Sequence, residues 1–256
     1  MRAIWTGSIS FGLVNIPVKM YSGSERHDGL DLRMLNKKDH SPIRYARVSR
    51  RDGKEVPYED IVKGYEWQDG DYIELTDEDF KKADAQKTKT LQIKQFADED
   101  ELDSRYYEKP YYLEPAKGAE RAYALLREAL EKSGKVALVK YAMRARDNMG
   151  VIKPQGRALV LNQMRFPSDL RDTGGLNLPD KNLASKEELD MALALANQQT
   201  KPFIPEDWHD EYTEELEKII AEKAKGHKPK ARGKEPENTK VEDLMSTLKA
   251  SLENKR

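Results

Sequence analysis

The side chains that most often carry catalysis are sparse in this 256-residue chain. It has no cysteine, and its four histidines, His27, His40, His209 and His227, are scattered along the sequence. No HExxH segment, Walker-type phosphate loop or GxGxxG segment occurs. Thiol catalysis, cysteine-zinc sites and disulfides are excluded because they need cysteine. We therefore predict no catalytic residue, no cofactor and no metal ion.

Carboxylates are abundant, and they make a metal-dependent nuclease the main enzymatic alternative. Such an enzyme gathers acids and a lysine around one or two Mg²⁺ ions. Pro179-Asp180 resembles the opening of a nuclease motif, but the next acid-x-Lys segment is Glu253-Asn254-Lys255, near the end of the sequence. The acidic runs at 77–79 and 98–101 are typical of helix starts and solvated loops. A catalytic metal site is therefore not expected.

Charge is segregated along the chain although the net charge is only −1. Residues 33–54 carry eight cations and two acids, residues 55–84 carry three cations and eleven acids, and residues 135–165 carry seven cations and one acid. Solvated faces that happen to alternate would explain one such block. Two separated basic blocks in strand-like sequence favour a shared basic surface, which is typical of nucleic-acid binding.

Alternating apolar residues predict the strands that would position these cations. The apolar parity changes at Gly12-Leu13, which indicates a bulge or bend where a strand turns a barrel corner. Further strands are predicted at 43–48, 72–75, 90–96, 136–146 and 157–166. Along 136–146 one parity is apolar and the other carries Lys140, Arg144 and Arg146, so one face belongs to the core and the other is cationic. The pattern indicates an antiparallel β-barrel.

Helices are fewer than strands. An apolar stripe predicts a helix over 119–132 that stops before Gly134. Ser185 and Glu188 form a capping box that opens a second helix. A third helix is predicted from Pro205, and Gly226 ends it.

The C-terminal part of the sequence reads as a linker followed by a short helix. Residues 227–238 contain proline, glycine and charge without a large apolar side chain, which is typical of disorder. The helix that follows, within 239–256, carries the apolar stripe Val241, Leu244, Met245, Leu248 and Leu252. A lone helix of this length is marginal in water. It either packs back on the core or folds on a partner, and the linker favours a partner.

Composition limits the class of protein. The chain is 36% charged, and no uncharged apolar run approaches the ~18–20 residues that a membrane span needs. Its first residues lack a secretory apolar region. We predict a cytoplasmic protein with no membrane partner.

Three segments, in the same order along the chain, resemble prokaryotic Ku, the DNA-end-binding family of non-homologous end joining. The first is Met1-Arg2-Ala3-Ile4-Trp5 with Gly7-Ser8-Ile9-Ser10-Phe11-Gly12-Leu13-Val14-Asn15-Ile16-Pro17-Val18-Lys19. The second is Glu55-Val56-Pro57-Tyr58-Glu59-Asp60-Ile61-Val62-Lys63-Gly64-Tyr65-Glu66, and the third is Tyr107-Glu108-Lys109-Pro110-Tyr111-Tyr112-Leu113. The resemblance spans about residues 1–226, and Val241-Glu242-Asp243-Leu244-Met245 resembles the short C-terminal element of bacterial members.

The resemblance implies an α+β, mainly β fold: an antiparallel β-barrel core with a long bridging excursion that forms a dimeric ring, plus a helical C-terminal arm. It divides the chain into a core at 1–205 with the bridge at about 44–72, a helical arm at 206–226, the basic linker at 227–238 and a partner-docking helix at 239–256. The ring would enclose double-stranded DNA. The predicted DNA contacts are Lys19, Arg33, Lys37, Lys38, Arg44, Arg47, Arg50, Arg51, Lys54, Lys140, Arg144, Arg146 and Lys153.

The family function implied is recognition of double-stranded DNA ends without sequence specificity by a homodimer. The C-terminal region would then recruit an ATP-dependent DNA ligase through Val241, Leu244, Met245, Leu248 and Leu252. The alternatives are the metal-dependent nuclease and a general nucleic-acid-binding adaptor with an open face. Some relatives carry cysteines near Ser49, whereas this chain has none. A metal-stiffened bridge is therefore not expected here.

Overall fold

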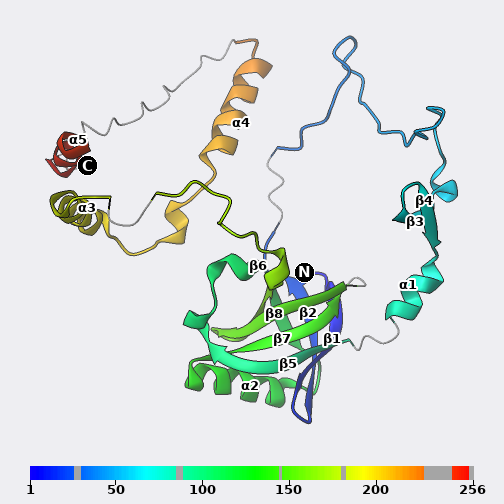
Figure 1. The fold of residues 1–256 in the computed structure, drawn as a ribbon, viewed down its shortest axis with the longest axis horizontal. Helices are drawn as coiled ribbons and strands as arrows, with labels where there is room; N and C mark the ends of the chain where they lie inside the picture. Colours follow the sequence, from blue (N-terminus) through cyan, green and yellow to red (C-terminus); the bar gives the residue numbers. More distant parts are fainter. Residues whose placement is uncertain (26–29, 85–88, 144–145, 180–182, 228–243, 254–256) are drawn as a thin grey trace. The chain divides into compact units, whose positions relative to one another are not determined.

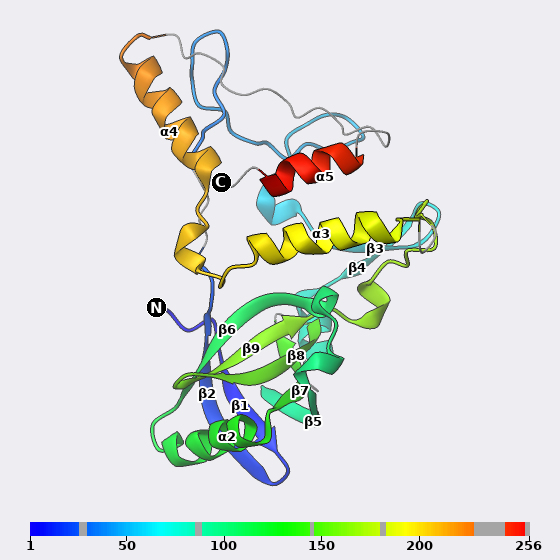
Figure 2. The same ribbon diagram turned by 90° about the vertical axis from the view of Figure 1, so that its left-hand side faces the viewer.

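The computed structural model describes residues 1–25, 30–84, 89–143, 146–179, 183–227 and 244–253. The chain forms two compact units, one of residues 1–27 and 33–172 and one of residues 28–32 and 173–256 (Figures 1 and 2). The first unit ends at Asp172, ahead of the predicted core boundary at residue 205.

A closed barrel of seven strands makes up most of the first unit. The strands follow the order β1-β2-β6-β9-β8-β7-β5 around the barrel. Neighbours pair antiparallel except β1 and β5, whose parallel pairing closes the barrel. Closure leaves no strand edge open for pairing with another chain. The strands are β1 (Trp5–Phe11), β2 (Val14–Ser22), β5 (Thr90–Asp98), β6 (Tyr107–Pro115), β7 (Lys135–Met143), β8 (Arg146–Gln155) and β9 (Ala158–Met164).

The change of apolar parity near residue 12 has a different cause from the predicted bulge. Phe11 pairs directly with Val14, so Gly12 and Leu13 form a two-residue hairpin turn between two strands. Gly12 has a φ of 57°, the left-handed region that favours glycine in such turns. An antiparallel two-residue turn shifts the parity by one because Ile9 pairs with Ile16 across the hairpin.

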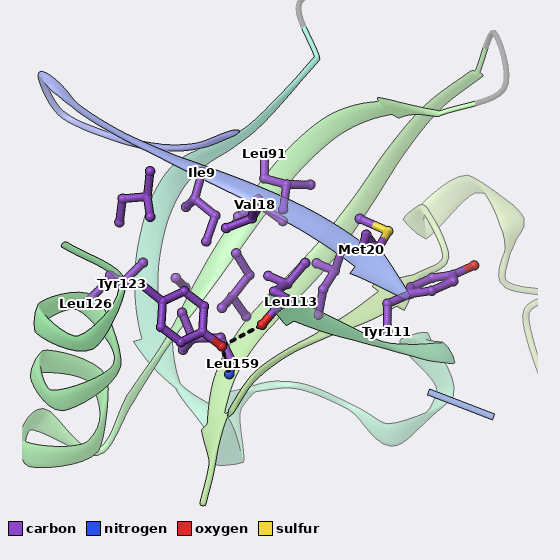
Figure 3. Close-up of a cluster of buried hydrophobic side chains, with 14 of the residues drawn as sticks. Ile9, Val18, Met20, Leu91, Tyr111, Leu113, Tyr123, Leu126 and Leu159 are labelled. Carbon is purple, nitrogen blue, oxygen red and sulfur yellow. Dashed lines mark hydrogen bonds between the residues drawn. The ribbon is translucent and has the colours of Figure 1, made fainter. Parts of the chain in front are cut away.

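The barrel interior is the core of the first unit. Its apolar side chains alternate along each strand, and Figure 3 shows several of them, among them Ile9, Val18 and Leu91, each with no exposed area. Helix α2 (Glu120–Ser133) packs against β7 and β8. It ends, as predicted, at Gly134, whose left-handed φ of 65° stops the helix.

One tyrosine ties α2 to two strands. The hydroxyl of Tyr123 donates a hydrogen bond to the backbone oxygen of Leu113 in β6 and accepts one from the backbone N–H of Leu159 in β9, each at 2.6 Å (Figure 3). Tyr123 is 6% exposed. Desolvation raises the pKa of its hydroxyl, and the Leu159 hydrogen bond partly offsets this.

More than sixty residues between β2 and β5 lie outside the strands of the barrel. We call this segment the excursion. It contains β3 (Lys63–Gln68), β4 (Asp71–Leu75) and α1 (Asp77–Asp84). Strands β3 and β4 pair with each other in a two-stranded sheet. Thr76 and Asp79 exchange hydrogen bonds at the start of α1, so the acidic run there opens a helix as predicted. The strand predicted at 43–48 is wrong, because only the isolated bridges Leu35–Pro42 and Val48–Glu55 form in this region.

The second unit is helical. Helix α3 (Lys186–Gln199) begins at the predicted capping box: Ser185 Oγ accepts from the Glu188 N–H, and a Glu188 carboxylate oxygen accepts from the Ser185 N–H. Helix α4 (Glu211–Ala224) begins later than predicted, because Asp210 rather than Pro205 caps it. Helix α5 (Leu244–Glu253) packs against α3. Short 3-10 turns occur at Tyr58–Asp60, Glu99–Glu101, Ser104–Tyr106, Pro167–Asp169 and Pro205–Asp207.

Among the described residues, none of the helices is long and apolar enough to cross a membrane. The predicted linker at 227–238 lies outside the described residues from 228 onward, and the predicted final helix lies outside them at 239–243 and 254–256.

Candidate nucleic-acid interface

The first basic block folds into tight turns rather than a strand. In the first turn, residues 36–41, the Asn36 N–H donates to the Ser41 oxygen and the His40 N–H donates to the Asn36 oxygen, each at 2.8 Å. The Asn36 side chain accepts from the Lys38 N–H, and the Asp39 carboxylate accepts from the Ser41 N–H, each at 3.0 Å. Hydrogen bonds from Ser41 hold the pKa of Asp39 below its usual value.

The same turn recurs thirteen residues later. In the second turn, residues 49–54, the Ser49 N–H donates to the Lys54 oxygen at 2.8 Å, and the Gly53 N–H donates to the Ser49 oxygen at 2.9 Å. The Ser49 hydroxyl accepts from the Arg51 N–H at 3.2 Å, and the Asp52 carboxylate accepts from the Lys54 N–H at 3.3 Å. Every one of these hydrogen bonds has a counterpart at the same position of the first turn.

Positive φ angles close both turns. His40 has φ 55° and Gly53 has φ 71°, and both occupy the same position of their turns. A histidine in this region is uncommon, and the four hydrogen bonds of its turn hold it there. Each turn is flanked by one bridge, Leu35–Pro42 or Val48–Glu55. We call the pair, residues 36–41 and 49–54, the twin turns.

Each of the twin turns presents two successive cations to solvent. Lys37 and Lys38 occupy the tip of the first turn, and Arg50 and Arg51 occupy the same two positions of the second. All four residues are exposed. Within the part of the chain that the structure describes, none of the four forms an ion pair. The following aspartate is engaged with its own backbone, so the four cations are available for an external anion such as phosphate.

The other predicted contacts in this block have partners nearby. The Arg44 guanidinium lies 3.5 Å from a Glu55 carboxylate oxygen, and the Lys54 ammonium lies 3.8 Å from that of Asp52. The Arg47 guanidinium lies 5.1 Å from the centre of the Tyr58 ring, a cation-π contact. Exposed ion pairs of this kind are weak and open readily when a phosphate competes. Arg33 is exposed as well.

The barrel part of the candidate interface differs from the prediction. The predicted strand 136–146 is two strands, because β7 ends at Met143 and β8 begins at Arg146. Arg146 pairs with Met143, and residues directly opposite in an antiparallel pair point to the same face. Met143 packs against the core cluster, whereas Lys140 has the opposite parity on β7. The prediction that Lys140 and Arg146 share one cationic face is therefore wrong, and Arg144 lies outside the described residues.

Acidic side chains accompany the other barrel cations. The Lys140 ammonium lies 3.9 Å from a carboxylate oxygen of Asp147, and the Lys153 ammonium lies 2.5 Å from that of Glu99. Lys19 is exposed on β2, and in the strand register it lies directly opposite Glu114 on β6. The barrel therefore carries its cations interspersed with acids, whereas the four cations at the tips of the twin turns, Lys37, Lys38, Arg50 and Arg51, have no acidic partner among the described residues.

The excursion also exposes apolar side chains that the sequence reasoning did not single out. On the β3–β4 pair, Tyr65 lies opposite Ile73 and Lys63 lies opposite Leu75, so the three apolar residues share one face. Tyr65 is 59% exposed, Ile73 48% and Leu75 37%. The sequence signal for this face is the alternation of Tyr65 with Glu66 and of Ile73 with Glu74.

Four of the five predicted ligase-docking residues fall on α5. Leu244 is 37% exposed, and Met245, Leu248 and Leu252 are half-buried. Val241 lies outside the described residues. Nothing in the described residues groups three metal-ligating side chains of the histidine or carboxylate type.

Comparison with known proteins places the chain in a family. Residues 10–191 match the model for the Ku70/Ku80 beta-barrel domain. A protein of Opitutus terrae named "Non-homologous end joining protein Ku" is 44% identical over 98% of this chain and 91% of its own length. A protein of the same name from Archaeoglobus fulgidus is 40% identical over 99% of both chains.

A third relative, "Non-homologous end joining protein Ku 2" of Saccharopolyspora erythraea, is 38% identical over all of this chain and 85% of its own length. Among solved structures, the SPOC domain of human PHD-finger protein 3 aligns over 64% of this chain and 97% of that one, with a TM-score of 0.30 and 12% identity. With the closed barrel, the matched domain and these near full-length relatives, the chain belongs to the bacterial and archaeal Ku family.

Proposed function

We propose that this protein binds the ends of double-stranded DNA without sequence specificity, as a homodimeric ring, during non-homologous end joining. It would act without catalysing a reaction and would recruit an ATP-dependent DNA ligase through α5. The observation that carries the proposal is the pair of twin turns, which hold four exposed cations at matched positions. Action at the nucleoid in the cytoplasm follows from this proposal and stays a prediction.

Phosphate is the ligand that fits the twin turns. Their tips carry only lysine and arginine, which are among the side chains that most often contact phosphate oxygens. Contacts to phosphate position a protein on DNA but carry no sequence information. Two turns with matched hydrogen bonds and two cations each are suited to phosphates of a duplex backbone, whatever its sequence.

The apolar face of the β3–β4 pair supports self-association. An isolated two-stranded sheet is marginally stable in water, and an uncovered apolar face marks a protein-protein contact. Tyr65, Ile73 and Leu75 form such a face. The second unit adds further exposed apolar side chains on α4 and before it, including Trp208 at 76% and Tyr212 at 75%. A second copy supplies a complementary surface to each, as in symmetric homodimers.

Charge reversal in the twin turns tests the proposed DNA binding. We expect that Lys38→Glu combined with Arg51→Glu weakens binding to all duplex sequences alike and lowers the salt dependence, because each lost phosphate contact removes about one unit from the slope. The matched control is Arg121→Glu combined with Lys132→Glu, an equal charge change at exposed positions of α2. Gel shifts at several salt concentrations measure both, and an equal loss in both variants would contradict a role of the turns.

The two alternatives give different results in simple assays. A metal-dependent nuclease would cut linear DNA in Mg²⁺ or Mn²⁺, and the cutting would disappear when a carboxylate is substituted. We expect no cleavage. A general adaptor with an open face would bind closed circular duplex as well as linear duplex, whereas a ring that threads onto an end needs a free end.

A further inference from the structure

Helix α5 packs on α3 within the second unit. We call this contact between the two helices the seat. The two helices pack against each other although at least 44 residues of sequence separate their nearest ends, and Figures 1 and 2 show them side by side. Both helices belong to the same compact unit. The sequence analysis weighed packing on its own chain against folding on a partner, and the linker favoured the partner.

Burial identifies the faces in contact. On α5 the half-buried residues are Met245, Leu248 and Leu252, spaced three and four apart, which puts them on one side of a helix. On α3 the half-buried apolar residues are Met191 and Leu195, which are four apart. Both faces are apolar stripes of the kind that pack helix against helix.

The opposite side of α3 is open. Leu189 and Leu193 are each 53% exposed, and at 3.6 residues per turn they lie nearly opposite Met191 and Leu195. Helix α3 therefore has two apolar sides, one covered by α5 and one not. This asymmetry provides a matched control for any test of the contact.

The contact is suited to being exchanged rather than permanent. No residue of α3 or α5 is fully buried, so the seat leaves part of each apolar side chain in water. A ten-residue helix has little stability alone. The seat therefore keeps α5 folded and covers its apolar stripe, but a partner that buries the stripe more completely can replace it.

We propose that α3 is an intramolecular docking surface for α5, and that α5 must leave α3 before it binds a partner protein. The second half of this statement rests on the proposed function, because the stripe hidden by α3 is the one proposed to dock the ligase. The seat then lowers the apparent affinity of the partner by the fraction of molecules in which α5 is free. The packing of α5 on α3 is in this way an autoinhibitory contact, because it lowers the apparent affinity for the partner.

Cysteine pairs test the seat without any partner, and the absence of native cysteine leaves no background thiol. We expect that Met191→Cys or Leu195→Cys, combined with Met245→Cys, Leu248→Cys or Leu252→Cys in the full-length protein, gives a disulfide within one chain under mild oxidation in at least one combination. Leu189→Cys or Leu193→Cys with the same three positions is the control and should give none. Mass spectrometry of peptides and denaturing gels report the product. Equal cross-linking from both sides of α3, no cross-link, or only a covalent dimer would each overturn the intramolecular seat.

Ligase binding tests the consequence. We expect that Met191→Glu with Leu195→Glu frees α5 and tightens binding of the ligase at least about threefold, because a larger fraction is competent. Leu189→Glu with Leu193→Glu should leave the affinity unchanged. Weaker or unchanged binding by the first variant would overturn the autoinhibition, even if the disulfide forms.

The failure of the proposed function would look different. Leu244→Glu should abolish ligase binding while the gel shift with DNA persists. If the ligase binds no variant, or binds the Leu244→Glu protein normally, the proposed recruitment through α5 fails, while the disulfide result still decides whether α3 seats α5.

Discussion

At the scale of single residues, two buried tyrosines of the barrel have opposite hydrogen-bonding states. Tyr123 is bonded to two backbone groups, whereas the Tyr141 hydroxyl is buried without a hydrogen-bond partner among the described residues. Burial raises the pKa of both hydroxyls. The two side chains are similarly buried, at 6% and 3% exposure. Comparing the two therefore separates the contribution of a hydroxyl group to the free energy of unfolding from the contribution of the buried ring.

We expect Tyr123→Phe to reduce the free energy of unfolding by about 1–3 kcal/mol, because it leaves a buried carbonyl of Leu113 and a buried N–H of Leu159 unpaired. Tyr141→Phe removes a hydroxyl that satisfies no protein group, so it should be neutral or stabilising. Urea unfolding of both variants measures the difference. A loss of equal size in the two variants would show that the Tyr123 hydrogen bonds contribute nothing of their own.

The twin turns illustrate how a residue pattern becomes a site. Two cations followed by aspartate occur at 37–39 and again at 50–52, and this repeat is visible in the sequence. Counting charge over residues 33–54 finds the block but not the repeat. The hydrogen bonds of Asn36, Asp39, Ser49 and Asp52 are what convert a charged segment into two equal tips.

At the scale of elements, the capping box of α3 makes its stability depend on pH. Hydrogen bonds from the Ser185 backbone and side chain lower the pKa of Glu188. A carboxyl whose pKa is lower in the folded state contributes stability above its unfolded pKa of about 4.3 and loses it as the pH falls through the folded value. The first turn of α3 should therefore loosen in acid and not in base.

Substitution of the cap gives a direct measurement. We expect Ser185→Ala to raise the pKa of Glu188 only part of the way toward its usual value, because the backbone N–H of residue 185 still donates to the carboxylate. Amide hydrogen exchange in the first turn of α3 should become faster at pH 7, since the Glu188 N–H loses its acceptor. An NMR titration follows the carboxyl. Unchanged amide exchange in this turn would mean that the Ser185 hydroxyl does not cap α3 in solution.

The β3–β4 pair is the element that we expect to need a second copy. Tyr65→Glu with Ile73→Glu places two charges on its apolar face and should shift the protein from dimer to monomer in sedimentation. Tyr72→Glu is the control, because Tyr72 pairs with Glu66 on the other face and is 67% exposed. A variant that remains a dimer after the double change would rule out this face as the contact.

At the scale of the whole molecule, a ring that reads only phosphate makes a quantitative prediction about salt. With about 6–10 phosphates neutralised, affinity for linear duplex should fall about 10³–10⁵-fold between 50 and 200 mM salt. Different sequences of one length should fall together. A marked preference among sequences, or a shallow salt dependence, would contradict binding through phosphate alone.

Topology gives the second prediction for the whole molecule. Threading requires a free end, so linear duplex should be bound, while covalently closed circles should not be. Duplexes with hairpin caps bulky enough to block the opening should bind more slowly than open ends. Gel shifts and association kinetics measure these differences, and equal binding of circles and linear duplex would favour an open adaptor face.

Much of the local structure could be predicted because it depends on residues close in sequence. The end of α2 at Gly134 and the start of α3 at Ser185 each follow from hydrogen bonds and backbone angles within one turn. The prediction of a strand at 43–48 was wrong, because alternating apolar residues cannot distinguish a strand from the flanks of a tight turn. The start of α4 was misplaced because Pro205 opens a 3-10 turn before Asp210 caps the helix.

The sequence by itself determined the family, the barrel class, the segregation of charge and the capped helices, because motif order, side-chain period and capping are local properties of the chain. Tertiary structure decided that Arg146 shares the face of Met143, that β1 closes the barrel against β5, and that α3 covers α5. Each of these depends on which distant segments pair. That choice rests on the relative free energies of competing partners, and no local pattern records those free energies.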